Sequence, residues 1–298
     1  MSRIRLALLG LLIVTAMAGC KVDSHEAGGA SPTPEPPAVL ETPAPGDTFA
    51  ELWWNGKRRV WKVHAPASYD GKTALPVVFV LHFYPGDGNE AASTTGMKAK
   101  ADKENFLAVF PDGWAAGYNA AICCGAEDDV GLIRRIAERM VTRWKADPKR
   151  FYVTGISNGA DMSFKLAVEA SDIFRAAAPV SGSFWGPKSL EASYKPKTPV
   201  SIVTFQGGSD ARFLTPMKDG AKLWRERNSC TPSAPVELGR KQTDPITRTD
   251  AKCADGSDFT VYSLPDMTHA WPGSSGPLGD PSAGLNATDL IWDFFKAH

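Results

Sequence analysis

The stretch Gly155-Ile156-Ser157-Asn158-Gly159 constrains the fold of this chain more than any other. An apolar run of β-branched and aromatic residues, 151–154, ends at the first glycine, and a helical pattern begins at the second. A serine hydroxyl acts as a nucleophile only where it projects clear of its neighbours beside a base. A sharp strand-to-helix turn gives that exposure, and flanking glycines leave room for the turn. The stretch predicts Ser157 as a nucleophile, the alternative being a glycine-rich turn with an incidental serine.

Apolar strands alternate with amphipathic helical patterns along residues 47–298, which we predict to form one catalytic domain. A chain of 298 residues with 43% hydrophobic residues can fill one large core. Near-continuous apolar strands separated by helices favour a doubly wound, mostly parallel sheet with helices on both faces, an α/β fold. The expected strands are 59–64, 77–82, 107–110, 151–154, 176–180, 200–205 and 259–264. The expected helices are 91–103, 130–145, 159–170, 218–227 and 287–296.

The base and the acid follow from chain order. In folds with this turn, the serine is followed along the chain by an acid and then by a histidine. Only His269 and His298 come after Ser157, and His298 is the final residue, so His269 is the predicted base. Asp210 is the first carboxylate after the strand at 200–205 and is the predicted acid. Four later aspartates remain as alternatives to it: Asp219, Asp244, Asp250 and Asp266.

Two backbone N–H groups are expected to bind the negative oxygen that forms when a serine attacks a carbonyl. One belongs to Asn158, the residue after the nucleophile, and the other to Phe83 or Tyr84 in the loop after the strand at 77–82. His82 precedes Ser157 in the chain, so we interpret it as a structural hydrogen-bonding residue.

The N-terminal residues read as an export signal followed by a spacer. Arg3 and Arg5 precede an apolar run that is too short to span a bilayer. The end of residues 1–20, Met-Ala-Gly-Cys, resembles a bacterial lipobox, which predicts lipidation of Cys20 and a membrane-anchored lipoprotein, periplasmic or at the cell surface. An ordinary signal that leaves Cys20 free is the alternative. Residues 21–46 are rich in Pro, Ala and Gly and predict a disordered tether.

Four cysteines remain after Cys20, an even number for an exported domain. Cys230 and Cys253 bracket a Pro-, Thr- and Asp-rich insertion, and we expect them to form a disulfide. Cys123 and Cys124 are adjacent, and both bridged and free forms are possible for them. A second pair of ligands for a metal is missing, so no metal site is predicted.

Several separate motifs recur in the order found in a known family. The motifs are the Ser157 turn, Phe110-Pro111-Asp112-Gly113, Cys123-Cys124-Gly125, residues 128–133 and His269-Ala270-Trp271-Pro272-Gly273. Together they resemble the secreted polyhydroxybutyrate depolymerase and feruloyl esterase group of α/β-hydrolases, related to carbohydrate esterase family 1. The resemblance implies a serine esterase without a cofactor or metal, acting on feruloyl or acetyl esters of plant polysaccharide or on hydroxybutyrate oligomers. Phe83 stands where the family usually has glycine.

Charge and aromatic content bear on the partners. Lysine plus arginine equal aspartate plus glutamate at 33 each, so no net field favours a nucleic acid. We expect a monomer that binds a small-molecule or polysaccharide ester and contacts the membrane only through its lipid anchor. Trp114, Trp185 and Trp271 are candidates to stack on the substrate, although core packing is the alternative for each.

Two other functions remain open at this point. A non-catalytic, glycan-binding lipoprotein would keep the fold and lose the chemistry, and the substitution at Phe83 is compatible with that. A peptidase of the same fold would use the same residues, but nothing indicates a charged specificity pocket.

Overall fold

The computed structural model describes residues 41–240 and 244–298, and their centre is one large sheet. The eleven strands follow the order β1-β2-β4-β3-β5-β6-β7-β11-β10-β8, with β9 paired to β10. Six neighbouring strands, from β4 to β11, are parallel, and those at the two edges are antiparallel. The strands are β1 Gly46–Trp54, β2 Lys57–Ala65, β3 Val77–Leu81, β4 Leu107–Pro111, β5 Phe151–Ile156, β6 Phe174–Val180, β7 Ser201–Gly207, β8 Thr231–Pro232, β9 Val236–Arg240, β10 Pro245–Lys252 and β11 Asp258–Leu264. A separate two-stranded ladder joins β12 (Trp271–Pro272) and β13 (Gly279–Asp280).

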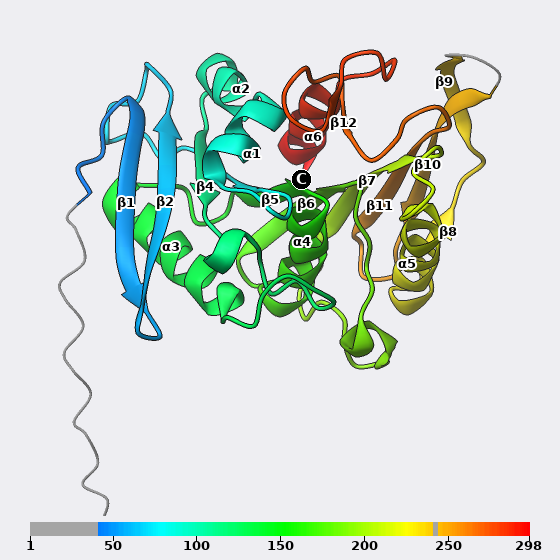
Figure 1. Cartoon of the computed structure of the whole chain (residues 1–298), viewed down its shortest axis with the longest axis horizontal. Helices are drawn as coiled ribbons and strands as arrows, with labels where there is room; N and C mark the ends of the chain where they lie inside the picture. Colours follow the sequence, from blue (N-terminus) through cyan, green and yellow to red (C-terminus); the bar gives the residue numbers. More distant parts are fainter. Residues whose placement is uncertain (1–40, 241–243) are drawn as a thin grey trace, which may run out of the picture. The chain divides into compact units, whose positions relative to one another are not determined.

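Helices cover both faces of this sheet (Figure 1). Residues of α3 (Asp129–Trp144), α4 (Asn158–Glu169) and α5 (Leu214–Arg227) form one hydrophobic core, which also contains Phe79 of β3. Residues of α1 (Gly88–Thr95), α2 (Met97–Glu104) and α6 (Ala287–Ala297) form a second hydrophobic core, which also contains Val78 and Val80 of β3. Successive strand residues thus enter opposite cores, as the pleat requires. The predicted doubly wound α/β fold is confirmed.

The single helix predicted over 91–103 is wrong, because the chain forms α1 and α2 there. Asp87 caps α1 through its carboxylate, which accepts from the N–H groups of Asn89 and Glu90. Gly96, at φ 65°, ends α1 in the left-handed region. The polar, alanine-rich sequence continues without a visible break, so this one glycine was the only signal in the sequence.

Strands at both edges of the sheet were missed. β1 pairs with β2 along its whole length, and β8, β9 and β10 extend the sheet beyond β11. Most residues of β10 are only half-buried, and its sequence is rich in threonine and charge. Edge strands gain their order from pairing with a neighbour more than from an apolar pattern, so sequence periodicity gave little sign of them.

The described chain begins at Glu41, inside the stretch predicted to be a tether. Glu41 is buried, and its carboxylate pairs with Arg139 of α3 at 3.1 Å. The end of that stretch therefore packs on the domain, five residues before β1 begins. Residues 1–20, with Cys20, and most of residues 21–46 lie outside the described residues. In residues 41–240 and 244–298, no helix has both the length and the apolar character that crossing a membrane requires.

A disulfide joins Cys230 and Cys253, in agreement with the pairing expected from the sequence. It links the end of α5 to the residue after β10 and encloses β8, β9 and β10. Those strands form the sheet edge next to β11, the strand that leads to His269. The cross-link therefore steadies an edge that has little apolar burial of its own.

Replacing both Cys230 and Cys253 by serine is expected to lower the free energy of unfolding by about 3–4 kcal/mol. The bond closes a loop with a sequence separation of 23, and the entropy lost by the unfolded chain on closing a loop of that length gives this magnitude. Urea unfolding of the two proteins measures the difference. An unfolding free energy within about 1 kcal/mol of the wild type would contradict the prediction.

Candidate active site

Ser157 lies at the turn between β5 and α4 with φ 57° and ψ −120°, a conformation that is strained for a non-glycine residue. The flanking glycines make this turn possible. A Cβ on Gly155 would lie 2.5 Å from the carbonyl oxygen of Gly159, and a Cβ on Gly159 would lie 2.4 Å from that of Leu81. The Ser157 N–H donates to the Val180 carbonyl at 3.1 Å, which ties the turn to β6. The geometry is that of a nucleophile elbow.

Asp210 and His269 meet at the ends of two neighbouring strands. β7 and β11 are parallel partners, so the loops that follow them leave the same edge of the sheet. The distance from Asp210 Oδ2 to His269 Nδ1 is 2.6 Å, and Asp210 is buried. The carboxylate accepts the proton on Nδ1, which leaves Nε2 as an acceptor. Asp210 Oδ1 accepts from the Phe213 N–H at 3.2 Å, which fixes the carboxylate.

Ser157 and His269 line the same small cavity, so all three predicted triad residues come together. The other candidate base, His298, lies at the end of α6. Its Nδ1 bonds to the Phe294 carbonyl and its Nε2 lies 3.1 Å from Asp258. In the part of the chain that is described, no group of three or more His, Cys, Asp and Glu side chains could hold a metal ion.

The loop after β3 is held by His82. Its Nδ1–H donates to the Phe83 carbonyl at 2.7 Å, and its Nε2 accepts from the Gly113 N–H at 2.9 Å. His82 is fully buried, and burial lowers the pKa of its ring. Both ring nitrogens are used, so His82 is structural, as predicted, and sets the path of the loop that carries Phe83 and Tyr84.

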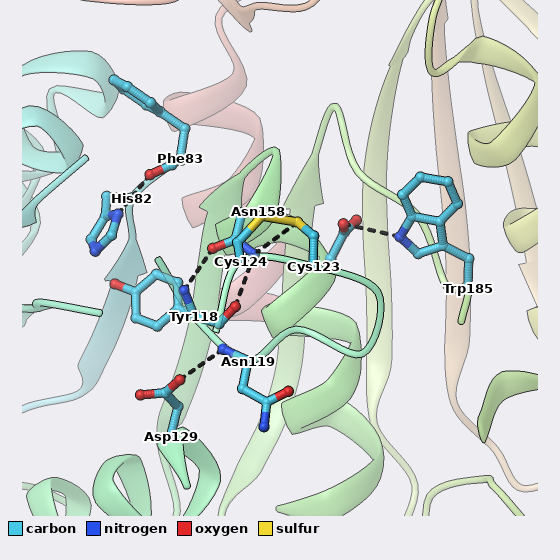
Figure 2. The surroundings of a disulfide bond; sticks show 10 residues. His82, Phe83, Tyr118, Asn119, Cys123, Cys124, Asp129, Asn158 and Trp185 are labelled. Carbon is cyan, nitrogen blue, oxygen red and sulfur yellow. Dashed lines mark hydrogen bonds between the residues drawn. A yellow bond between two sulfur atoms is a disulfide. The ribbon is translucent and has the colours of Figure 1, made fainter. Parts of the chain in front are cut away.

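Asn158, the first residue of α4, has an N–H without a partner inside the helix. Its buried side chain is held by the backbone of Tyr118, whose N–H donates to Oδ1 at 2.8 Å and whose carbonyl accepts from Nδ2 at 3.1 Å. Nδ2 also lies 3.9 Å from Cys123 Sγ. Cys123 and Cys124 are joined in a disulfide, and Figure 2 shows this bond beside Asn158. The cysteine pair therefore borders the predicted oxyanion site.

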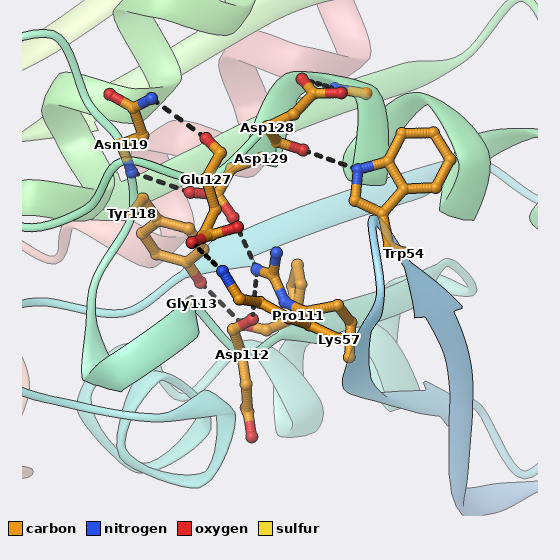
Figure 3. Close-up of polar contacts among 12 residues, drawn as sticks. Trp54, Lys57, Pro111, Asp112, Gly113, Tyr118, Asn119, Glu127, Asp128 and Asp129 are labelled. Atoms are coloured by element: carbon orange, nitrogen blue, oxygen red, sulfur yellow. Dashed lines mark hydrogen bonds and ion pairs between the residues drawn. The ribbon is translucent and has the colours of Figure 1, made fainter. Parts of the chain in front are cut away.

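A buried ion pair is connected, through hydrogen bonds, to the turn that carries Ser157 and Asn158. Arg59 and Asp129 lie 2.5 Å apart with side chains 2% and 1% exposed. The second oxygen of Asp129 accepts from the Asn119 N–H at 2.7 Å, as Figure 3 shows. A chain of contacts thus links Arg59 on β2 to Asp129 and then to Asn119. Asn119 follows Tyr118, and the backbone of Tyr118 holds the Asn158 side chain.

Arg59→Met is expected to lower the free energy of unfolding by about 3–5 kcal/mol, because it leaves the Asp129 carboxylate buried without its cation. Urea unfolding checks this. Arg135→Met is the matched control, since the Arg135–Glu138 pair is exposed and is expected to be worth at most about 1 kcal/mol. Equal effects of the two substitutions would show that the buried pair does not support the fold.

The three tryptophans predicted to contact substrate differ in their surroundings. Trp185 lines the cavity with Ser157. Trp114, in the short helix η1 (Trp114–Ala116), is 40% exposed, does not line that cavity and has Lys57 Nζ 5.1 Å above its ring. The prediction for Trp271 is wrong, because its side chain is fully buried beneath α6, where Nε1 donates to Thr288 at 3.0 Å.

Sequence reasoning missed two residues of the site, Asp161 and Phe213, which also line the cavity. The Phe213 ring centre lies 4.8 Å from that of His269. Asp161 follows Ser157 by four positions and lies in the first turn of α4, which begins directly after the nucleophile. That spacing was the signal that could have identified Asp161.

Comparison with known proteins relates the chain to esterases. No family model matches it. It is 27% identical over 222 residues to the putative esterase NocK of Nocardia uniformis subsp. tsuyamanensis, which covers 68% of this chain and 63% of NocK. A probable feruloyl esterase C of Aspergillus niger is 26% identical, with 82% of this chain and 85% of that protein covered. The poly(3-hydroxybutyrate) depolymerase of Ralstonia pickettii is 25% identical, with 79% and 55% covered.

A solved structure supports the same fold. The acetyl xylan esterase from Aspergillus awamori superposes with a TM-score of 0.58 at 14% identity, over 83% of this chain and 99% of that one. The chain spans less than two thirds of the length of NocK and of the depolymerase. The chain therefore has the α/β-hydrolase fold that this structure shares, and its sequence is similar to those of a feruloyl esterase and of a poly(3-hydroxybutyrate) depolymerase.

Proposed function

We propose that this chain is a serine esterase that cleaves carboxylic esters by two-step acyl transfer. The observation that carries the proposal is the 2.6 Å contact between Asp210 and His269 beside a serine held at a positive φ. A glycine-rich turn with an incidental serine would not require a histidine at the same cavity with a buried carboxylate bonded to its ring.

The roles follow from the geometry. His269 Nε2 takes the proton of Ser157 as the hydroxyl oxygen attacks the ester carbonyl, and Asp210 stabilises the imidazolium that forms. N–H groups of Asn158 and of Phe83 or Tyr84 bind the oxyanion. His269 then gives the proton to the leaving alcohol. Water repeats the sequence on the acyl-enzyme and releases the acid.

Feruloyl or acetyl esters of plant polysaccharide are the proposed substrates, and hydroxybutyrate oligomers are the alternative. The relatives named as feruloyl esterase and depolymerase support this choice. An exported lipoprotein, anchored through Cys20, is the proposed setting. The two disulfides support an oxidising compartment.

The test is hydrolysis of p-nitrophenyl acetate, methyl ferulate, acetylated xylan and hydroxybutyrate oligomers by the protein without residues 1–40, together with labelling by a fluorophosphonate. We expect hydrolysis of at least one ester and one phosphonyl group on the peptide that contains Ser157. A folded protein that neither hydrolyses any of them nor takes the label would favour the glycan-binding alternative.

A further inference from the structure

The cavity beside Ser157 is small and has a buried acid in its wall. Its volume is about 20 Å³, little more than one water-sized group requires. Ser157 and His269 line it, and Asp161, Trp185, Phe213 and Met217 are among its other lining residues. An acyl group attached to Ser157 that enters this cavity would lie against these walls, and a space of this size fits a methyl group more readily than a longer chain or an aromatic ring.

Asp161 is the buried titratable group in the wall of this cavity that the acyl-transfer mechanism does not use. It is 7% exposed, and both carboxylate oxygens accept from N–H groups. Oδ1 accepts from the Ser183 N–H at 2.7 Å and Oδ2 from Trp185 Nε1–H at 3.0 Å. Gly182 permits this approach, because a Cβ there would lie 2.4 Å from the Ala160 side chain. The loop after β6 is therefore bound to the first turn of α4 through this one carboxylate.

The same contact fixes the aromatic wall of the cavity. The Trp185 ring lies 6.3 Å from that of Phe213 at an interplanar angle of 82°, and Phe213 packs on His269. Figure 2 shows the Trp185 indole nitrogen turned toward the carboxylate on α4. If the carboxylate did not accept its N–H, the half-buried indole would lose the hydrogen bond from Nε1 and could leave the cavity.

We infer that Asp161 is a specificity-determining positioning residue, which holds Trp185 as the wall of the acyl pocket and so restricts the enzyme to short acyl groups such as acetyl. This rests on the proposed serine esterase activity. The inference also favours acetyl over feruloyl esters among the proposed substrates, because a feruloyl group would fit only if the Trp185 indole moved. Asp161 acts through Trp185 and does not touch the reacting atoms.

The ionisation of Asp161 provides a second test of this role, the pH dependence of the preference for short acyl groups. Burial raises the pKa of Asp161 to about 7, and the N–H bonds from Ser183 and Trp185 oppose that rise. Below pH 7 the carboxyl is neutral and accepts more weakly. The other titratable groups at this site are His269 and, behind it, Asp210. Their ionisation affects kcat/KM of all esters alike, so a ratio of kcat/KM for two esters removes it.

The experiment compares kcat/KM for p-nitrophenyl acetate and p-nitrophenyl butyrate, which share a leaving group, and for methyl ferulate. The wild type is expected to prefer the acetate, with a preference that decreases as the pH falls through 7. Asp161→Asn keeps the shape of the side chain but replaces one of its two acceptor oxygens by an NH₂ group. This variant is expected to lower the ratio of kcat/KM for acetate to that for butyrate about tenfold, and the ratio should no longer depend on pH. Trp185→Ala is expected to lower it further and to admit methyl ferulate.

Controls separate this role from a merely structural one. Trp185→Phe removes the N–H donor without touching the buried acid, and should lower the ratio even if Asp161→Asn does not fold. Asp250→Asn, a carboxylate that accepts from Thr260 on the neighbouring strand, should leave the ratio unchanged. A wild type that prefers the butyrate, or an unchanged ratio in the Asp161 and Trp185 variants that remain active, would overturn the inference while the esterase stands. Absence of hydrolysis and of Ser157 labelling would instead reject the esterase and the inference with it.

Discussion

Ser157→Ala is expected to lower kcat for ester hydrolysis by a factor on the order of 10⁶ while the protein stays folded. The substitution removes only the hydroxyl oxygen that forms the acyl-enzyme, and neither His269 nor Asp210 can replace it. The strained backbone accepts alanine as it accepts serine, since both carry one Cβ. The measurement is kcat for the best ester of the panel, with circular dichroism as the check on folding.

Ser163→Ala is the matched control for this prediction. Ser163 lies on α4, the helix that follows Ser157; it is buried and donates to the Gly159 carbonyl at 2.8 Å, but it does not line the cavity. Its loss is expected to change kcat by at most a few-fold. If Ser157→Ala kept more than about one hundredth of the wild-type kcat, another nucleophile or a directly activated water would have to carry the reaction.

The residues of the central sheet and of the elbow were predictable because each has a local cause. Apolar strands buried on both faces leave continuous runs in the sequence, and Ser157 lies between glycines that the turn requires. His269 and Asp210 could be identified without knowing any distance, since chain order and strand ends limit the choice. The nearness of the three side chains then follows from the parallel order of β5, β6, β7 and β11.

The residues that sequence reasoning misjudged depend on packing between distant segments. Trp271 follows His269 closely, yet its ring turns into the core under α6, where it donates to Thr288. Trp185 and Asp161 meet only because Gly182 lets a loop lie on α4. β8, β9 and β10 likewise take their order from pairing and from the Cys230–Cys253 bond. None of these causes is periodic in the sequence.

Asp210→Asn is expected to lower kcat about 10⁴-fold with little change in KM. The carboxylate now accepts from His269 Nδ1–H at 2.6 Å and keeps Nε2 free to accept the proton of Ser157. An asparagine amide in the same place can donate to Nδ1, which favours the tautomer with the proton on Nε2. That nitrogen can then no longer act as the base, although every side chain stays in place.

Another aspartate, Asp266, provides the control for this prediction. Asp266 lies in the same loop as His269, and one of its oxygens is buried without a hydrogen-bond partner in the described structure. Asp266→Asn is expected to keep kcat within a few-fold, because this carboxylate has no bond to the imidazole. If Asp266→Asn lost activity and Asp210→Asn did not, the acid would have been assigned to the wrong strand end. A large loss confined to Asp210→Asn, with unchanged KM, would mean that its carboxylate acts on the orientation and charge of His269 and not on substrate binding.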